Sequence, residues 1–330
     1  MEPLLRWAAP SVLAAVLGGC LGGAEFDGAG AADAGPSIDC EGIPRGPFEG
    51  RFLDSPIAFE DFAFDAEGNL VGTDGAALFK SPYDGDPQVF VASVSGLLGM
   101  RFLPNGDLVA ASGAAGEVVR IDSDGAQHSL LAGLMSPNGI AVDVEGFVYV
   151  GELYGNSVRR VDPATGDFTY VVDGDVPGPN GLAFSTTDST LYVGGWGEGI
   201  LYSVSRDAKG VWGGLDVVDP DASNDLLHGL AVDACDNVYV SDIGATMRDG
   251  LYWTVVYRIP AGGGPHEILF DSTTLGYNVL GSNLDFGSGI GGWDANSLYL
   301  LSDYEGVIEI PVGVPSKPRP FPPVPVPEED

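Results

Sequence analysis

Asn138-Gly139-Ile140-Ala141-Val142-Asp143, followed by Phe147-Val148-Tyr149-Val150, is one copy of a phrase that recurs along this chain. The frame returns at Asn180-Gly181-Leu182-Ala183-Phe184 and at His228-Gly229-Leu230-Ala231-Val232-Asp233. Two weaker copies come earlier, at Glu60-Asp61-Phe62-Ala63-Phe64-Asp65 and Leu98-Gly99-Met100-Arg101-Phe102. The copies lie about forty residues apart, the size of one unit in a repeat protein. The first residue of the phrase differs between copies, while the residues after it stay similar. We therefore expect the catalytic or ligand-binding side chains at that first position.

One repeat contains four predicted strands. Apolar residues alternate over 140–143, which is the period of a strand, and a turn at 144–146 leads to a second strand at 147–150. Two further strands are expected at 157–161 and 168–172, joined by the turn Asp162-Pro163-Ala164-Thr165-Gly166. Four antiparallel strands in each repeat are typical of a β-propeller blade.

The repeats predict an all-β protein, a six-bladed β-propeller of four-stranded antiparallel blades within residues 41–314. The fourth strand of the last blade is expected from residues 48–53, which precede the first blade, so an N-terminal strand closes the ring and removes its free edges. The expected blades are 60–94, 96–134, 136–175, 178–222, 226–272 and, with that strand, 281–310.

Both ends of the chain read differently from the repeats. Residues 1–19 have the charge and short apolar stretch of a signal peptide, and Leu17-Gly18-Gly19-Cys20 resembles the bacterial lipobox, which implies lipidation at Cys20. The alternative is cleavage by an ordinary signal peptidase. A flexible Gly/Ala/Asp-rich tether is expected over 20–40 and a solvated, Pro-rich tail over 315–330. The lipobox reading implies a lipid-anchored protein of the bacterial cell envelope, facing the periplasm or the exterior.

The composition limits the partners. The chain of 330 residues has 47 acidic and 14 basic residues, so its formal net charge of −33 excludes nucleic acid as a ligand. The negative charge is compatible with cation binding or with solubility alone.

Apart from Cys20 the cysteines are Cys40 and Cys235, which either form a disulfide in an exported protein or remain two thiols. We expect a monomer.

The copies at Asn180 and His228 resemble the senescence-marker-protein/gluconolactonase family, a family of six-bladed propellers, over roughly residues 60–310. The copy at Asn138, with Gly151-Glu152-Leu153-Tyr154-Gly155-Asn156, equally resembles an NHL repeat, another unit of six-bladed propellers. In the gluconolactonase family the first residue of the phrase faces the central channel, and several blades hold one divalent cation. The resemblance therefore implies a metal-dependent hydrolase that acts on a lactone or small ester.

Carried over residue by residue, the resemblance places the metal ligands at Glu60, Asn180 and His228 and a substrate contact at Asn138. His228 stands where the family has an aspartate that is both ligand and general base. Neutral imidazole accepts a proton readily, so His228 is the candidate catalytic base. The cation is calcium or zinc, and imidazole favours zinc.

A second acidic layer is expected where each second strand ends. Its members either line the channel and bind substrate or are loop carboxylates bonded to backbone amides, and Asn283 is a further candidate in the sixth blade. The layer comprises Asp74, Glu152, Asp242 and Asp303. The second functional hypothesis is a non-catalytic propeller that binds a small molecule or an envelope protein.

Overall fold

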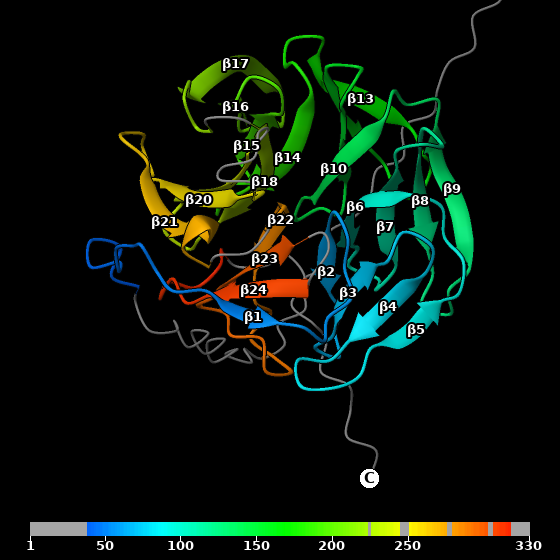
Figure 1. Ribbon diagram of the computed structural model, residues 1–330. Coiled ribbons are helices and arrows are strands. Elements are labelled where there is room, and N and C mark those ends of the chain that lie inside the picture. The colour runs from blue at the N-terminus through cyan, green and yellow to red at the C-terminus, as the bar shows by residue number, and fades with distance from the viewer. Residues whose placement is uncertain (1–37, 224–225, 245–250, 276–278, 303–305, 318–330) are drawn as a thin grey trace, which may run out of the picture. The chain divides into compact units, whose positions relative to one another are not determined.

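Each copy of the phrase forms the innermost strand of a four-stranded antiparallel sheet, and six such sheets form a ring (Figure 1). The structure is a computed structural model, and it describes residues 38–223, 226–244, 251–275, 279–302 and 306–317. The described residues belong to one compact unit that begins at Ile38. The prediction of a six-bladed propeller is confirmed.

The first three blades follow the order of the chain, from the innermost strand outward. Their strands are β2 (Phe62–Phe64), β3 (Leu70–Thr73), β4 (Leu78–Ser81), β5 (Gln88–Val91), β6 (Leu97–Phe102), β7 (Leu108–Ser112), β8 (Glu117–Ile121), β9 (Gln127–Ala132), β10 (Pro137–Val142), β11 (Val148–Glu152), β12 (Ser157–Val161) and β13 (Phe168–Asp173).

The remaining blades repeat this order, and a short 3-10 helix, Ser272–Leu275, follows the fifth. Their strands are β14 (Pro179–Phe184), β15 (Thr190–Gly195), β16 (Ile200–Arg206), β17 (Trp212–Asp219), β18 (Leu226–Val232), β19 (Val238–Ile243), β20 (Thr254–Ile259), β21 (Glu267–Asp271), β22 (Gly281–Phe286), β23 (Leu298–Ser302), β24 (Gly306–Ile310) and β1 (Arg51–Leu53).

The ring closes through the N-terminal strand, as predicted. β1 pairs antiparallel with β24, so that Phe52 lies opposite Ile308. In Figure 1 the blue strand β1 lies beside the red strand β24. Because the first and last parts of the body share one sheet, the sixth blade has four strands like the others.

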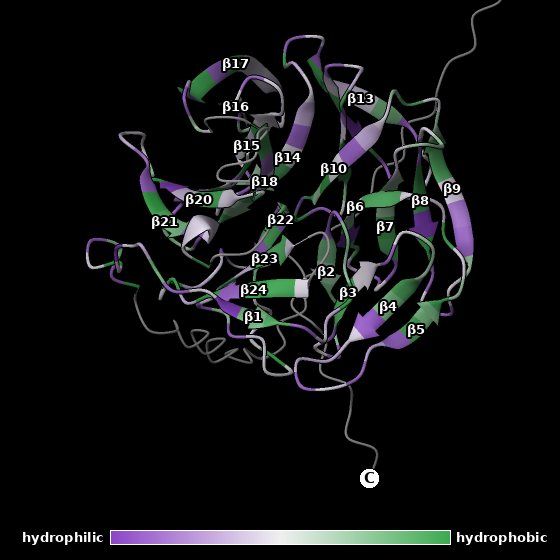
Figure 2. Ribbon diagram, in the orientation of Figure 1, coloured by the Kyte–Doolittle hydropathy of each residue, from purple (hydrophilic) through white to green (hydrophobic). Residues whose placement is uncertain are grey.

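The core lies between neighbouring blades. Aromatic side chains from the second strands contact the next inner strand: Tyr149 meets Phe184 edge to face at 4.8 Å, and Tyr239 meets Phe286 at 5.2 Å between ring centroids. Figure 2 shows hydrophobic residues along β7, β23 and β24 and a long hydrophilic stretch on the outer strand β9. Each blade buries its faces against two neighbours, which is why the repeat cannot fold alone.

The glycine of the phrase lets adjacent inner strands approach closely. A β-carbon added at Gly139 would lie 1.6 Å from the backbone oxygen of Asn180. One added at Gly181 would lie 2.6 Å from the backbone oxygen of His228. The glycine therefore serves packing, while the residue before it is free to vary.

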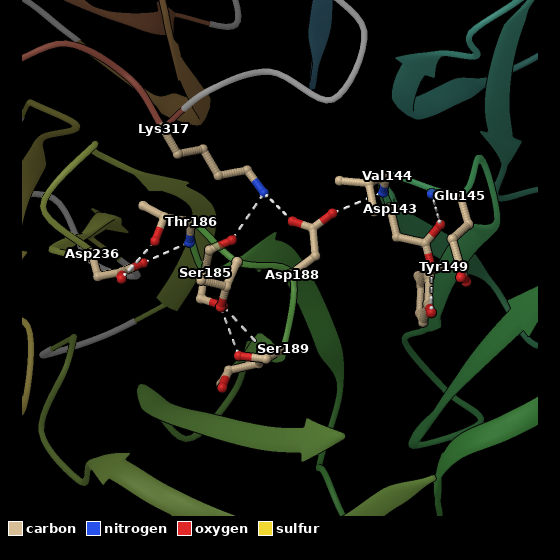
Figure 3. A network of polar contacts seen from close by, with 12 residues as sticks. Asp143, Val144, Glu145, Tyr149, Ser185, Thr186, Asp188, Ser189, Asp236 and Lys317 are labelled. Atoms are coloured by element: carbon tan, nitrogen blue, oxygen red, sulfur yellow. Dashed lines mark hydrogen bonds and ion pairs between the residues drawn. The ribbon is translucent and has the colours of Figure 1, made fainter. Parts of the chain in front are cut away.

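The aspartate that ends the phrase stabilises a turn. Oδ1 of Asp143 accepts hydrogen bonds from the backbone N–H groups of Glu145 and Phe147, and Oδ2 accepts one from the hydroxyl of Tyr149 at 2.9 Å (Figure 3). Asp233 makes the same bonds in the fifth blade. These carboxylates belong to the frame of the fold.

The segment after β24 packs on the ring, which corrects the prediction of a solvated tail from residue 315. Ser316 forms an isolated bridge with Asp233, and the backbone N–H of Lys317 donates to Val232. Figure 3 shows the side chain of Lys317 pointing to Asp188, with 2.9 Å between Nζ and Oδ1. Asp188 also accepts from the backbone N–H of Val144. Asp188 lies more than a hundred residues before Lys317 in the chain, so the composition of the C-terminal segment alone could not predict this contact. Residues 318–330 lie outside the described residues.

Cys40 and Cys235 form a disulfide that joins the segment before β1 to a turn of the fifth blade. The same segment is bound where the backbone N–H of Phe48 donates to Leu269. Among the described residues, no helix has the length and apolar character needed to cross a membrane. The segment predicted to be a signal peptide, and Cys20, lie outside the described residues.

Candidate functional site at the channel mouth

One pocket is lined by residues from all six blades, at the end of the channel where the inner strands begin. We call it the channel mouth. The space that the centre of a water-sized sphere can occupy inside it is about 10 Å³, which is room for about one water molecule or one ion, with larger groups lying outside in the open solvent. Its lining comprises Glu60, Asp61, Gly99, Arg101, Asn138, Gly139, Ile140, Asn180, Gly181, Leu182, His228 and Asn283.

Local backbone irregularity directs the variable residues into the mouth. In five blades the register shifts at the start of the inner strand, for example between Pro137 and Ile140, and the first two residues of the phrase lie within the shift. In the first blade Glu60 precedes the strand and has a φ of 69°, a left-handed conformation that is uncommon outside glycine. Such conformations persist where neighbouring contacts enforce them.

The structure brings Glu60, Asn138 and His228 together. Nδ2 of Asn138 donates to Oε1 of Glu60 at 3.2 Å, and Nδ1 of His228 lies 3.9 Å from the same oxygen. Burial raises the pKa of Glu60, and the hydrogen bond from Asn138 opposes that shift only in part. The mouth therefore holds a carboxylate whose charge is poorly compensated by the protein.

Asn180 is 4% exposed, and its Nδ2 is buried with no hydrogen-bond partner within the described part of the chain. Leaving a buried amide without a partner costs about 1–3 kcal/mol. Buried polar groups of this kind are expected to meet a ligand or an ordered water. Asn180 is thus the residue of the mouth that most directly indicates a bound group.

Beneath Glu60 lies a polar layer that the sequence analysis missed. Asp61 is 2% exposed and accepts hydrogen bonds from the backbone N–H groups of Phe62 and Met100, from Nη1 of Arg101 and from Nδ2 of Asn283. Burial raises the pKa of Asp61 to about 6, against the opposing charge of Arg101, so the carboxylate is ionised at neutral pH. These bonds tie the first blade to the second and the sixth and hold the backbone next to Glu60.

Aligning the copies shows the signal for this layer. Asp61 stands where other copies have Gly139, Gly181 and Gly229. In the sixth blade Leu284 pairs with Leu300 as Ile140 pairs with Val150, so Asn283 also takes the glycine position and Ser282 takes that of Asn138. Asn283 still lines the pocket, but in the lower layer.

The acidic layer predicted at the ends of the second strands is outside the pocket lining. Glu152 is 1% exposed and accepts from Ser157, from Arg159 and from the backbone N–H of Met135. Asp242 accepts from the hydroxyl of Ser223 at 2.6 Å. Asp74 caps its own turn through the N–H groups of residues 76 and 77, and Asp303 lies outside the described residues. Asp74 therefore fits the alternative of a loop carboxylate bonded to backbone amides, whereas Glu152 and Asp242 lie in strands β11 and β19 and are bonded mainly to side chains.

We expect Glu152→Gln to lower the free energy of unfolding at neutral pH by about 2–3 kcal/mol, since it leaves the guanidinium of Arg159 without its charge partner. Burial alone would raise the pKa of Glu152, but the hydrogen bonds from Ser157 and Arg159 outweigh it and lower the pKa below its ordinary value of 4.5. The stabilisation is therefore present above that value and is lost as the pH falls through the folded-state pKa. Denaturant unfolding at pH 7 and pH 3.5 tests this: an equal gap between variant and wild type at both pH values would contradict it.

The mouth offers a small donor set for a cation. Among the described residues, no cluster of three or more His, Cys, Asp or Glu side chains could hold a metal ion. Glu60, Asn180 and His228 supply one carboxylate, one amide and one imidazole, which is too few oxygens for calcium without added water. A carboxylate with an imidazole is typical of zinc. In this set Oδ1 of Asn180 would bind the cation, with water completing the coordination. The unpartnered Nδ2 of Asn180 is a hydrogen-bond donor and would meet an oxygen of water or substrate instead.

Fold and site together define a six-bladed propeller with a small polar pocket at one end of its channel. Similar solved structures include a gluconolactonase from Xanthomonas campestris, 22% identical with a TM-score of 0.60 over 79% of this chain and 88% of that one. The calcium-binding protein regucalcin from Agrobacterium tumefaciens is 18% identical, with a TM-score of 0.62 over 84% and 97%. Virginiamycin B lyase from Staphylococcus aureus is 15% identical, with a TM-score of 0.53 over 80% and 89%.

These likenesses establish the fold that the resemblance to gluconolactonases implied. No protein-family model matches the sequence, and comparison with curated proteins finds no match. At such identities the activity has to be argued from the channel mouth itself.

Proposed function

We propose that the channel mouth binds one divalent cation through Glu60, Asn180 and His228 and hydrolyses a lactone or a small ester. The observation that carries the proposal is that these side chains, from three blades, line one pocket together with the buried amide of Asn180, whose unpartnered Nδ2 would donate to an oxygen of water or substrate. The structural likeness to a gluconolactonase and to a calcium-binding propeller supports the choice of chemistry. Zinc suits the imidazole better than calcium does.

A bound cation would polarise the substrate carbonyl and offset the charge of Glu60. A neutral imidazole has one free lone pair, so His228 serves either as a ligand of the cation or as the base, not as both at once. As the base, His228 accepts a proton from the attacking water as the water oxygen bonds to the carbonyl carbon. The bond between that carbon and the ring oxygen then breaks, and His228 returns the proton to the leaving oxygen, giving a hydroxy acid. Asn138, already bonded to Glu60, orients the substrate beside this water.

A non-catalytic binding propeller is the second candidate. The observation in its favour is the absence of any cluster of three acidic, histidine or cysteine side chains able to hold a metal in the described ranges. The mouth would then bind a small molecule or an envelope protein through Asn138 and Asn180. Both candidates predict a ligand at Asn180, and only the first predicts turnover.

The discriminating experiment is hydrolysis of a panel of lactones and small esters by the mature protein, with and without added zinc or calcium. Turnover that requires one of the cations supports the hydrolase. If no substrate is consumed under any condition while a ligand of the panel still binds, the binding propeller is the correct reading.

We propose further that the protein is exported and anchored to a membrane by lipid on Cys20, and that it acts there as a monomer. The sequence around Cys20 and the disulfide between Cys40 and Cys235 support an exported, oxidising location. Cys20→Ala should move the protein from the membrane fraction to the soluble fraction. Persistence of the variant in the membrane fraction would refute the anchor.

A further inference from the structure

Two neighbouring blades present an uncharged surface beside the channel mouth. The chain as a whole carries 47 acidic residues, yet in the second and third blades no charged residue occurs in the loops that precede the inner strands or follow the second strands. We call this surface the uncharged sector. Its loops are residues 92–98, 112–116, 133–138 and 153–156.

The sector carries large apolar side chains in exposed positions. Met135 is 57% exposed and Tyr154 is 70% exposed, and the backbone N–H of Tyr154 donates to the oxygen of Met135 at 3.2 Å. The neighbouring residues are bonded in the same way: the backbone N–H of Leu153 donates to the backbone oxygen of Ser136 at 3.0 Å. Ser136 stands two residues before Asn138 in the mouth. The exposed side chains are thus joined by backbone bonds to the pocket wall.

Further apolar side chains flank this pair. In the second blade Leu98 holds the position that Asn138 has in the third, and it packs toward Gly113. On the other side, Leu153 and Trp196 both lie against Gly178, at 3.5 Å from the position of an added β-carbon. The sector therefore extends from the second blade to the edge of the fourth, and it meets the pocket lining at Asn138.

We propose that the uncharged sector binds an apolar substituent of the substrate, so that the protein takes a lactone or ester with an alkyl or aromatic group in preference to a polyhydroxylated sugar lactone. This inference rests on the proposed hydrolase site for the position of the carbonyl group. Apolar side chains that are exposed to solvent next to a binding site are stabilised by a ligand group that covers them. A neutral apolar group also avoids the negative charge of Glu60 and Asp61.

The experiment compares γ-lactones whose alkyl substituent lengthens by one methylene at a time with a sugar lactone. Full burial of one methylene corresponds to about a fourfold gain in binding, so we expect KM to fall by up to that factor at each step. Met135→Ser/Tyr154→Ser should flatten this dependence and leave the sugar lactone unchanged. Val211→Ser is the matched control, because Val211 is 62% exposed on a turn away from the mouth.

Calorimetric binding of the corresponding alkyl lactams separates this inference from the proposed activity. Binding that strengthens with chain length supports the sector even if no lactone is hydrolysed. Absence of lactam binding, equal affinity at all lengths, or an unaltered dependence in the double variant would overturn the inference. So would a change of oligomeric state in the double variant by light scattering, which would assign the sector to a contact between copies.

Discussion

Gly139→Ala should lower the free energy of unfolding by about 3 kcal/mol, at the upper end of the range for overpacked sites. The added β-carbon would lie 1.6 Å from the backbone oxygen of Asn180, and no flexible side chain can move to relieve that contact. Two inner strands would have to separate, which would disturb both the packing of the ring and the geometry of the mouth. Denaturant unfolding of the purified variant measures the loss.

Gly214→Ala is the control. An added β-carbon there meets nothing within 4 Å, and Gly214 lies in the outer strand β17. We expect this variant to stay within about 0.5 kcal/mol of the wild type, as surface substitutions usually do. Equal stability of the two variants would show that close approach of the inner strands is not what the phrase glycine provides.

His228→Ala should reduce kcat for lactone hydrolysis by about a hundredfold to ten-thousandfold, the contribution typical of a general base. The side chain lines the mouth with Nδ1 at 3.9 Å from the Glu60 carboxylate. A fall in metal affinity in the same variant would assign His228 the role of cation ligand instead, because one imidazole lone pair cannot serve both roles. Steady-state kinetics together with metal content measure both effects.

His128→Ala controls for the loss of an imidazole. His128 lies on β9, the outermost strand of the second blade and the one farthest from the channel. Its side chain is half exposed and pairs with Asp122 at 2.8 Å. It should keep full activity. Activity retained by His228→Ala would remove His228 from the reaction and leave the carboxylates of Glu60 and Asp61 as the pocket-lining groups able to accept a proton.

The fold was predictable because its signals are local and repeated. Apolar residues that alternate with period two, turns such as 162–166 and a recurring phrase predict the strands one by one. The pairing of β1 with β24 follows from the need to close the ring. The same alignment of copies predicted that Glu60, Asn138, Asn180 and His228 line one pocket, which they do.

Other features depend on contacts that no local pattern encodes. Glu152 was a candidate for the channel because its position repeats, but within its own blade Arg159 neutralises its charge and Ser157 donates a hydrogen bond to it. The binding of Lys317 to Asp188 joins segments remote in the chain. Asp61 escaped notice because an acidic residue in an acidic chain carries little information until its four hydrogen-bond donors are seen.

The central claim is that Glu60, Asn180 and His228 hold one divalent cation. Calorimetric titration of zinc and calcium into the chelator-treated mature protein tests it most directly. We predict one site per chain, lost in Glu60→Gln and retained in Glu67→Gln, whose carboxylate is exposed and pairs with Lys80 instead. Absence of binding in the wild type, or equal affinity in Glu60→Gln, would contradict the claim.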